Sequence, residues 1–367
     1  MKYLLISSMI LLLVTVECQA QCPNDITLTY TTQYDIDTFK LNYPNCKYLS
    51  SINLDYSDVD PITDLTGFQN IDSLSRDLRI VGLSELTNLD GLQSLRRVDD
   101  LIIKDCGKLV TSGALQGLNI ITGELKLENN ISLNDLTGFR NIDSLVSTLT
   151  LSELSGLTNL DGLQNLQRVR RLIISDCNLL ESTSKLKSLK IVTSDFVILR
   201  NAILSDLGGF DSLEFVGEDF EIIGNPKLNS IAGFNKLKVI ESGHLKMSFN
   251  DTLEIVEGFN SLVDIGDELN LNIPSLIRLD GFNSLVSNAI EFDNHDFLEE
   301  VAGFSNLKFA PNITFKYNPK LTKVPEFGQL DSIGGGLYIE NNEILRNISG
   351  FYNLKGVRYH HFLCCEV

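Results

Sequence analysis

Short stretches in which apolar and polar residues alternate recur along the chain and predict β-strands. In Leu125-Lys-Leu-Glu every second residue is apolar, so Leu125 and Leu127 should point inward and Lys126 and Glu128 outward. Segments 77–81, 100–104, 219–223 and 336–340 show the same pattern. Each is followed by a short turn and a leucine, so we expect a strand and a tight corner at each one.

A second block, ending in glycine followed by phenylalanine or leucine, comes after each predicted strand. We expect this glycine to take a positive φ at a corner, the next apolar side chain to stack on its counterparts, and a stretch such as Gln93–Val98 to form a helical turn. The coil near residues 185–189 has lost its glycine. The others are Gly67, Gly91, Gly117, Gly138, Gly162, Gly209, Gly233, Gly258, Gly281, Gly303, Gly328 and Gly350.

The 283 residues from Gly67 to Gly350 contain 12 intervals, about 23.6 residues each. Self-similarity at such a period is typical of a leucine-rich-type solenoid, in which each repeat adds one coil. We therefore predict a mainly β fold, a right-handed parallel β-solenoid with short helical turns. It should comprise about 13 coils over residues 61–355, with a C-terminal tail at 356–367.

Counted from the first leucine of the first strand in each coil, the sixth residue falls in the turn after that strand. It is repeatedly asparagine or cysteine, and once histidine. A buried asparagine there can hydrogen-bond the backbone of its own and the neighbouring coil, and a small cysteine can fill the same space. We call this set the ladder. Leu83 and Leu154 interrupt it. Its members are Cys106, Asn130, Cys177, Asn201, Asn225, Asn250, His295, Asn318 and Asn342.

The N-terminus is typical of a secretory signal peptide over residues 1–20. Lys2 precedes an apolar run from Leu4 to Val16, which is shorter than the roughly 20 residues of a membrane span. Cleavage after Ala20 would leave Gln21 first. Lipidation at Cys18 is the alternative, but Glu17 does not fit the small residue expected before a lipidated cysteine. We expect no transmembrane or lipid-tail anchor.

The coils and the N-terminal segment resemble receptor L-domain arrays. The resemblance rests on Leu-x-x-Leu-x-Gly-Phe/Leu followed by a strand and asparagine, and on the segments 22–25 and 45–54. Secreted bacterial surface arrays and fungal cell-wall glycoproteins share parts of the pattern. The resemblance implies a cap over residues 21–60 bridged by Cys22 and Cys46. It also implies a binding function, although the chain lacks the cysteine-rich module and kinase of the receptors.

Composition narrows the possible partners and cysteine roles. Forty-eight acidic and 30 basic residues give a net charge of −18, which argues against nucleic acid or an anionic membrane surface as the main partner.

Cys106 and Cys177 lie three coils apart, about 14 Å, too far for a disulfide. Cys364 and Cys365 are open to a vicinal bridge, a link between two chains, or the reduced state. Their neighbouring histidines lack an established zinc spacing, so we expect no metal.

The outward positions of the first strands are mostly polar, but six are apolar. Four of them fall in consecutive coils and two lie further up the array: Ile173, Val197, Leu199 and Ile223 are the first group, and Ile102 and Val81 are the second. Exposed apolar patches usually mark interfaces, so we predict that these residues form a partner-binding face. The alternative is that a corner loop or a neighbouring face covers them, or that the assigned register is off by one residue there. Among four Asn-x-Ser/Thr sequons, Asn312 and Asn347 are the expected glycan sites, because Asn130 and Asn250 belong to the buried ladder.

These observations favour a secreted or cell-surface protein that binds an extracellular protein or glycan through its strand face. We find no catalytic motif and expect no enzyme activity and no cofactor. A structural component of a cell wall or matrix is one alternative. A β-helix carbohydrate-active enzyme is another, and Glu291 and Asp293 are its nearest candidate carboxylates. A homodimer linked through Cys364 or Cys365 is also open.

Overall fold

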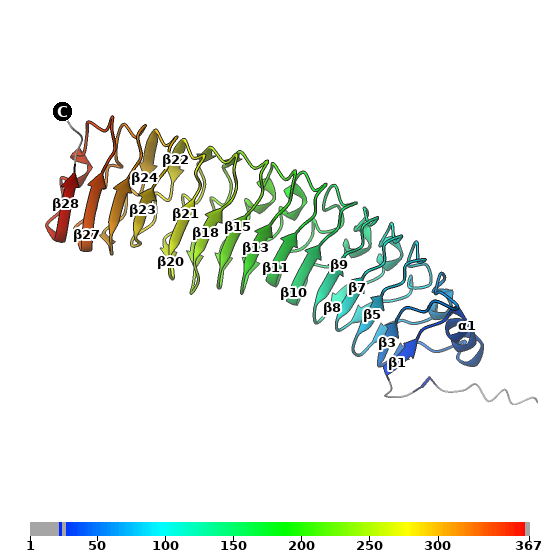
Figure 1. The fold of residues 1–367 in the computed structure, drawn as a ribbon. Helices are drawn as coiled ribbons and strands as arrows, with labels where there is room; N and C mark the ends of the chain where they lie inside the picture. The colour runs from blue at the N-terminus through cyan, green and yellow to red at the C-terminus, as the bar shows by residue number, and fades with distance from the viewer. Residues whose placement is uncertain (1–21, 24–26, 364–367) are drawn as a thin grey trace, which may run out of the picture.

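The computed structural model of the protein describes residues 22–23 and 27–363. The chain winds through about 14 stacked coils into a long, gently curved solenoid (Figure 1). This confirms the expected mainly β, parallel solenoid and adds about one coil to the expected number. The expected signal peptide and Cys364 and Cys365 lie outside the described residues.

The main strands pair in parallel along one side of the solenoid. They arise where apolar residues alternate with polar ones, which buries Leu125 and Leu127 completely while Lys126 and Glu128 stay partly accessible. In chain order the main strands are β1 (Thr27–Tyr30), β3 (Ser51–Leu54), β5 (Leu78–Val81), β7 (Leu101–Lys104), β9 (Leu125–Glu128), β10 (Ser144–Ser152), β11 (Arg168–Ser175), β13 (Phe196–Leu199), β15 (Phe220–Ile223), β18 (Leu245–Ser248), β21 (Leu269–Asn272), β23 (Ile290–Asp293), β26 (Ile313–Lys316), β27 (Ser332–Glu340) and β28 (Gly356–Leu363).

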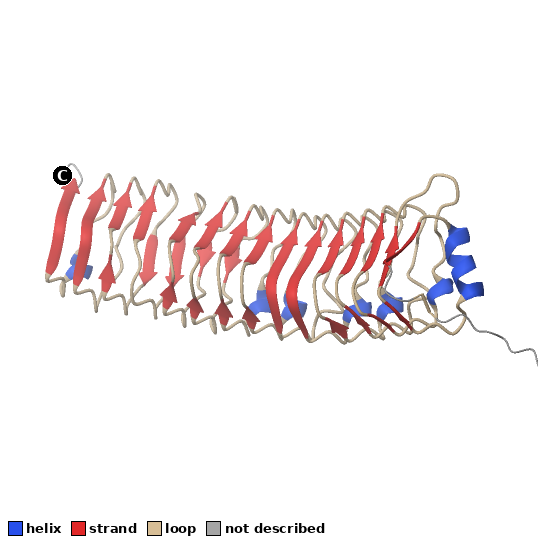
Figure 2. Cartoon of the chain, turned by 90° about the horizontal axis from the view of Figure 1, so that it is seen from below, coloured by secondary structure: helices blue, strands red, loops and turns tan. Residues whose placement is uncertain are grey.

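Shorter strands form further parallel sets on the other sides of the coils (Figure 2). One sheet contains β2 (Tyr48–Leu49), β4 (Ser73–Leu74), β6 (Arg97–Val98) and β8 (Ile120–Ile121). A second run, which continues from β11, contains β12 (Ile191–Val192), β14 (Phe215–Val216), β17 (Val239–Ile240) and β20 (Asp264–Ile265), and β25 (Phe309–Ala310) pairs with β27. Another contains β16 (Ser230–Ile231), β19 (Ile255–Val256), β22 (Arg278–Gly281) and β24 (Glu300–Gly303). The long strands β10 and β11 contribute to both the main set and the second run.

Helical turns occur at the glycine block and not at Gln93–Val98, where we expected one. That stretch forms a turn that leads into β6. The short 3-10 helices are η1 (Thr66–Phe68), η2 (Gly113–Leu115), η3 (Thr137–Phe139), η4 (Ser184–Leu186), η5 (Gly208–Phe210) and η6 (Ser349–Phe351).

The recurrent glycine also has a different role from the expected one at most coils. Positive φ angles occur at Gly91, Gly162 and Gly303. At Gly209 the constraint is space, because an added Cβ would lie 1.8 Å from the carbonyl oxygen of Thr183 in the preceding coil. Close approach of two backbones, more than turn geometry, therefore explains the glycine.

Apolar side chains from all sides of each coil fill one continuous core. The expected stacking of aromatic side chains is present, with Phe234, Phe259, Phe282 and Phe304 forming a column. Successive ring centroids in this column are 5.1, 5.1 and 5.7 Å apart. Each coil thus buries its apolar face only against its neighbours, as expected for a solenoid.

A helix that we did not foresee, α1 (Gln33–Asn42), covers the N-terminal end of the core (Figure 1). Thr32 and Asp35 form a capping box at its start, the Thr32 hydroxyl accepting from the Asp35 backbone and the Asp35 carboxylate accepting from the Thr32 backbone. Ile36 and Phe39 are buried against the first coil.

At the C-terminal end, β28 pairs in parallel with β27. The repeat stack therefore runs to Leu363, and residues 356–363 are a strand, whereas we expected a tail to begin at residue 356. The alternation of apolar and polar residues that identifies the other strands is not recognisable in β28, because this strand contains basic and aromatic residues.

Pairing between the main strands is interrupted once within the described residues. β21 pairs with β18, and β23 pairs with β26, but no pairing joins β21 to β23, although β22 and β24 of the same two coils still pair. We call this interruption the seam. Two side chains bridge it. Asn288 accepts from the Leu269 N–H at 3.2 Å and donates to the Asp267 carbonyl at 3.0 Å, and His295 Nε2 lies 3.2 Å from the Leu271 carbonyl.

Candidate binding face

The outward side chains of the main strands form two rows, which together we call the outer face. Cross-strand pairing fixes both rows. The first row is Arg79, Ile102, Lys126, Thr150, Ile173, Val197, Glu221, Lys246 and Asn270. The second is Val81, Lys104, Glu128, Ser152, Ser175, Leu199, Ile223, Ser248 and Asn272.

Four of the six predicted apolar residues meet on this face. Ile173 lies opposite Val197, and Leu199 lies opposite Ile223. Val197 and Leu199 are two residues apart on β13 and therefore share a side of the sheet. We call these four residues the apolar patch. It spans three consecutive coils, those of β11, β13 and β15.

The other two residues lie apart from the patch, in coils nearer the N-terminus, as the sequence indicated. Ile102 lies between Arg79 and Lys126, and Val81 lies beside Lys104. Ile102 and Val197 are also only 9 % and 8 % exposed. Neighbouring side chains on a parallel sheet lie close enough to cover one another, so outward direction did not guarantee exposure.

Ion pairs frame the apolar patch at both ends of its strands. Arg171 Nε lies 2.7 Å from Asp195 Oδ2 just before β13. Just after β13, Arg200 contacts Asp176 through two bonds of 2.9 and 2.7 Å. Such accessible pairs add little stability. They surround an apolar centre with a polar rim, which is the usual anatomy of a protein interface.

The ladder residues are buried and link successive coils. Asn225 shows the pattern, because its Oδ1 accepts from the Asn201 N–H at 3.1 Å and its Nδ2 donates to the Ile198 carbonyl at 3.2 Å. Asn130, Asn201, Asn250, Asn318 and Asn342 make equivalent bonds. The ladder therefore satisfies backbone groups inside the solenoid.

Cys106 and Cys177 occupy ladder positions as free, fully buried thiols. Burial raises the pKa of the Cys106 thiol to about 11 and that of Cys177 to about 12. Both thiols are therefore protonated at neutral pH, and the thiolate is the reactive form. These two residues contribute to packing in the ladder.

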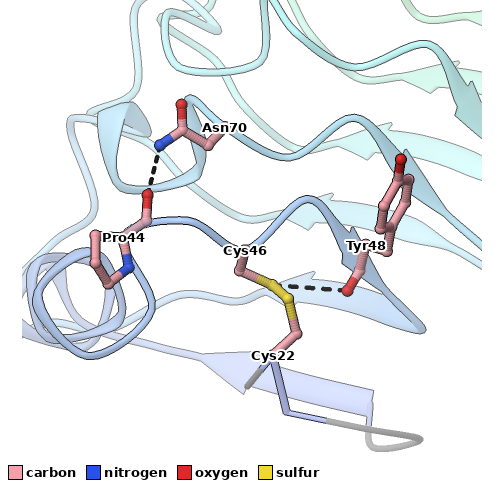
Figure 3. The surroundings of a disulfide bond; sticks show 5 residues. All are labelled: Cys22, Pro44, Cys46, Tyr48 and Asn70. Atoms are coloured by element: carbon pink, nitrogen blue, oxygen red, sulfur yellow. Dashed lines mark hydrogen bonds between the residues drawn. A yellow bond between two sulfur atoms is a disulfide. The ribbon is translucent and has the colours of Figure 1, made fainter. Parts of the chain in front are cut away.

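Cys22 and Cys46 form a disulfide in the N-terminal cap, with their Cα atoms 5.2 Å apart (Figure 3). Nearby, the Asn70 amide of the first coil donates to the Pro44 carbonyl at 2.6 Å (Figure 3). The disulfide ties the segment before β1 to the end of the cap, and Asn70 ties the cap to the solenoid.

The two predicted glycan sites differ in environment. Asn347 is exposed, and its Oδ1 accepts from the backbone of Ser349 at 2.8 Å. Asn312 is half-buried, and its Oδ1 accepts from the backbone of Gly336 at 2.9 Å. Asn347 is therefore the more accessible acceptor, and glycosylation at either position stays a prediction.

Glu291 and Asp293, the carboxylates singled out from the sequence, both project from β23 beside the seam. Partial burial raises the pKa of each carboxyl group, and their mutual repulsion adds to the shift at Glu291. Glu268 from the neighbouring coil lines the same hollow. The sequence analysis paired Glu291 with Asp293. It did not identify Glu268 or the seam that separates Glu268 from those two residues.

The parallel strands, the buried asparagines and the repeated Leu-x-Leu segments define the chain as a β-solenoid of leucine-rich-type repeats. No family model and no curated protein matches it. Among solved structures it is similar to a leucine-rich repeat protein from Bacteroides ovatus. The two are 14 % identical over 85 % of this chain and 92 % of that chain, with a TM-score of 0.20. A score that low carries no argument about function.

Proposed function

We propose that this protein is a secreted or cell-surface binding protein that recognises an extracellular protein or glycan through the apolar patch. The observation that carries the proposal is the clustering of four outward-facing apolar residues in three consecutive coils of a mostly polar outer face. Extended solenoid faces are well suited to recognition, and an apolar centre with a charged rim is typical of interfaces.

An extracellular setting is supported by features that lie far from the patch. Disulfides persist mainly in oxidising compartments, and the cap contains the Cys22–Cys46 bridge. The resemblance to receptor L-domain arrays and the apolar N-terminal run point the same way. None of the helices in residues 27–363 is long and apolar enough to cross a bilayer.

The test is a binding screen of the chain from Gln21 onward against extracellular proteins and glycans. The double variant Ile173→Asp with Ile223→Asp should abolish a hit, because it places two charges where an apolar partner surface must dock. Val81→Asp is the matched control, since it adds a charge to the same face away from the patch. A hit that survives the double variant would move the binding site elsewhere.

The two alternatives predict different results in the same screen. A structural wall or matrix component would bind none of the soluble partners while remaining folded. A carbohydrate-active enzyme would cleave glycans in the array, and Glu291→Gln should stop that cleavage. Binding without cleavage, lost in the double variant, is the outcome that the proposal requires.

A further inference from the structure

A pocket with a volume of about 540 Å³ opens at the corner of three consecutive coils, outside the main strands. Arg140 comes from the coil that contains η3, Asp161 and Gln164 come from the next coil, and Lys185 and Lys187 come from the coil that contains η4. We call this the basic pocket. No residue of the apolar patch lines it, so binding there is independent of the proposed function.

The lining of the basic pocket concentrates positive charge in a chain whose net charge is −18. Arg140, Lys185 and Lys187 bring three cations, whereas only Asp161 brings a carboxylate among the described residues of the lining. Lys185 neutralises that carboxylate, because its Nζ lies 2.7 Å from Asp161 Oδ1. Within the described part of the chain neither Arg140 nor Lys187 forms an ion pair, and Arg140 donates instead to the Gln116 amide.

The carboxylates next to the pocket are engaged or directed elsewhere. Asp135, in the coil of Arg140, accepts hydrogen bonds of 2.5 and 2.8 Å from two threonines. Asp211 occupies the position of Lys187 in the following coil. Its Oδ1 lies 3.4 Å from the place where a Cβ on Gly233 would be, so it points toward the coil beyond. The charges of Arg140 and Lys187 therefore remain available to a ligand.

An internal duplication shows that the coils do not require these cations for packing. Asn70-Ile-Asp-Ser-Leu recurs 71 residues later as Asn141-Ile-Asp-Ser-Leu, so residues 66–116 and 137–187 are equivalent units. The middle coil keeps its aspartate, glycine and glutamine in both units. The cations belong to the second unit alone: Gln69, Ala114 and Gln116 stand in the first unit where Arg140, Lys185 and Lys187 stand in the second.

The lysine at position 185 also releases an amide donor at the pocket. In the first unit the Gln93 amide accepts from a backbone N–H at 2.8 Å and donates to Asp90 at 3.0 Å. In the second unit Gln164 makes the same backbone bond at 2.8 Å, but Lys185 holds Asp161. Gln164 Nε2 has no hydrogen-bond partner among the described residues, so it adds a neutral donor between the charged ones.

We infer that the basic pocket binds a sulfate or carboxylate group carried by an anionic glycan. Such a group presents several acceptor oxygens, which suit guanidinium and ammonium donors. Arg140 and Lys187 lie two coils apart, about 10 Å along the stack, with Gln164 between them. A pocket of about 540 Å³ is in the range of small-molecule sites and leaves space for a sugar ring beside the anion. The hydroxyls of that ring suit the Gln164 amide and the exposed Ser184 hydroxyl.

The experiment measures binding to the chain from Gln21 onward by isothermal titration calorimetry at low salt. The probes are a chondroitin sulfate tetrasaccharide, its unsulfated counterpart, sodium sulfate, and an acetylated and amidated tetraglutamate peptide. At least one tetrasaccharide should bind more tightly than sodium sulfate and the peptide. The tighter tetrasaccharide then tells whether sulfate or carboxylate is preferred. Equal or tighter binding of sodium sulfate or of the peptide would overturn the assignment to a glycan.

Two double variants test whether the pocket itself is responsible. Arg140→Gln with Lys187→Gln restores the residues of the first unit and should weaken tetrasaccharide binding about fivefold or more, because two accessible charge contacts are lost together. Lys227→Gln with Lys308→Gln removes the same charge from exposed positions in other coils and should change the affinity by less than about twofold. Equal weakening by both pairs, or no binding of either tetrasaccharide to the parent chain, would overturn the proposal.

Discussion

At the scale of single residues, the ladder position decides whether a coil can satisfy its neighbour's backbone. Asparagine satisfies the preceding coil at two points, because its amide accepts from a backbone N–H and donates to a backbone carbonyl of that coil, as Asn318 does with His295 and Phe292. Cysteine fills the space, and its thiol donates to a nearby carbonyl, that of Lys104 at 3.4 Å in the case of Cys106. The backbone N–H of Cys106 donates to the Asn130 amide of the next coil. Cysteine is tolerated at a ladder position because the next coil supplies an asparagine in both cases, Asn130 after Cys106 and Asn201 after Cys177.

Removal of one ladder amide should therefore be costly. Asn225→Ala leaves the N–H of Asn201 and the carbonyl of Ile198 buried without their partner, each worth about 1–3 kcal/mol. We expect a loss of about 2–4 kcal/mol in the free energy of unfolding, measured with urea. The exposed Asn229→Ala should change it by less than about 0.5 kcal/mol. Similar effects of the two substitutions would contradict the role given to the ladder.

His295 should make stability depend on pH. Burial lowers its pKa below the ordinary 6.5, so between these two values the unfolded chain binds the proton and the folded chain does not. The contribution of His295 is then complete above pH 6.5 and is lost as the pH falls. His295→Asn keeps a ladder residue and removes the titration. The urea stability curves of the two proteins should run parallel at pH 8 and diverge below about pH 6.5. Curves that stay parallel to about pH 5 would exclude this contribution.

At the scale of elements, the corner is defined by how closely consecutive coils approach. The 3-10 turn η5 places Gly209 so near Thr183 that no side chain fits between them. In later coils the aromatic residue after the glycine takes the left-handed conformation itself, as Phe259 and Phe282 do. That conformation costs free energy, and the stacked rings on both sides offset it.

Gly209→Ala should consequently destabilise the chain by about 1–3 kcal/mol, the range for overpacked sites, because the coils must move apart. Gly107→Ala provides the control, since the nearest atom to its added Cβ is 3.8 Å away. Thermal unfolding monitored by circular dichroism would compare them. A melting temperature that falls equally for both would contradict the role given to the close approach at Gly209, because Gly→Ala without a clash reduces the entropy of the unfolded chain and does not destabilise the fold.

The features that could be predicted from the sequence are those that repeat. The alternation of apolar and polar residues and the spacing of the glycines were enough to predict the coils, the ladder and the stacked phenylalanines, because each of these features recurs many times. The helix over Gln33–Asn42 occurs once, and its capping box at Thr32 and Asp35 is a weak local signal. The seam falls at a short coil, with 21 residues from Leu269 to Ile290 against 24 from Leu245 to Leu269, and the average period conceals this difference. The covering of Val197 depends on side-chain packing that alternation does not encode.

At the scale of the whole molecule, stability is a sum of coils and of the interfaces between neighbours. Most interfaces combine pairing of the main strands, ladder bonds and apolar packing. The interface at the seam keeps the packing and the β22–β24 pairing, but Asn288 and His295 replace the pairing of the main strands. The main sheet is thus divided into a capped block that ends at β21 and a second block from β23 to β28.

Hydrogen exchange should distinguish these blocks. We expect peptides from β26 to lose protection at lower urea concentrations than peptides from β13, because the second block lacks the cap and is joined by the weaker interface. Mass spectrometry of exchanged peptides would give both curves in one sample. Simultaneous loss of protection in the two regions would mean that the seam transmits cooperativity as fully as the paired interfaces do.

The division also has a mechanical consequence. If the protein is displayed at a surface, as proposed, it carries load along its length when a partner is pulled away, and a series of joints yields first at the weakest one. Here that joint is between β21 and β23, beyond the apolar patch and on the side away from the disulfide. Stretching would separate the strands from β23 onward while the patch and the capped coils stay folded, so a bound partner would remain held as the rest of the molecule extends.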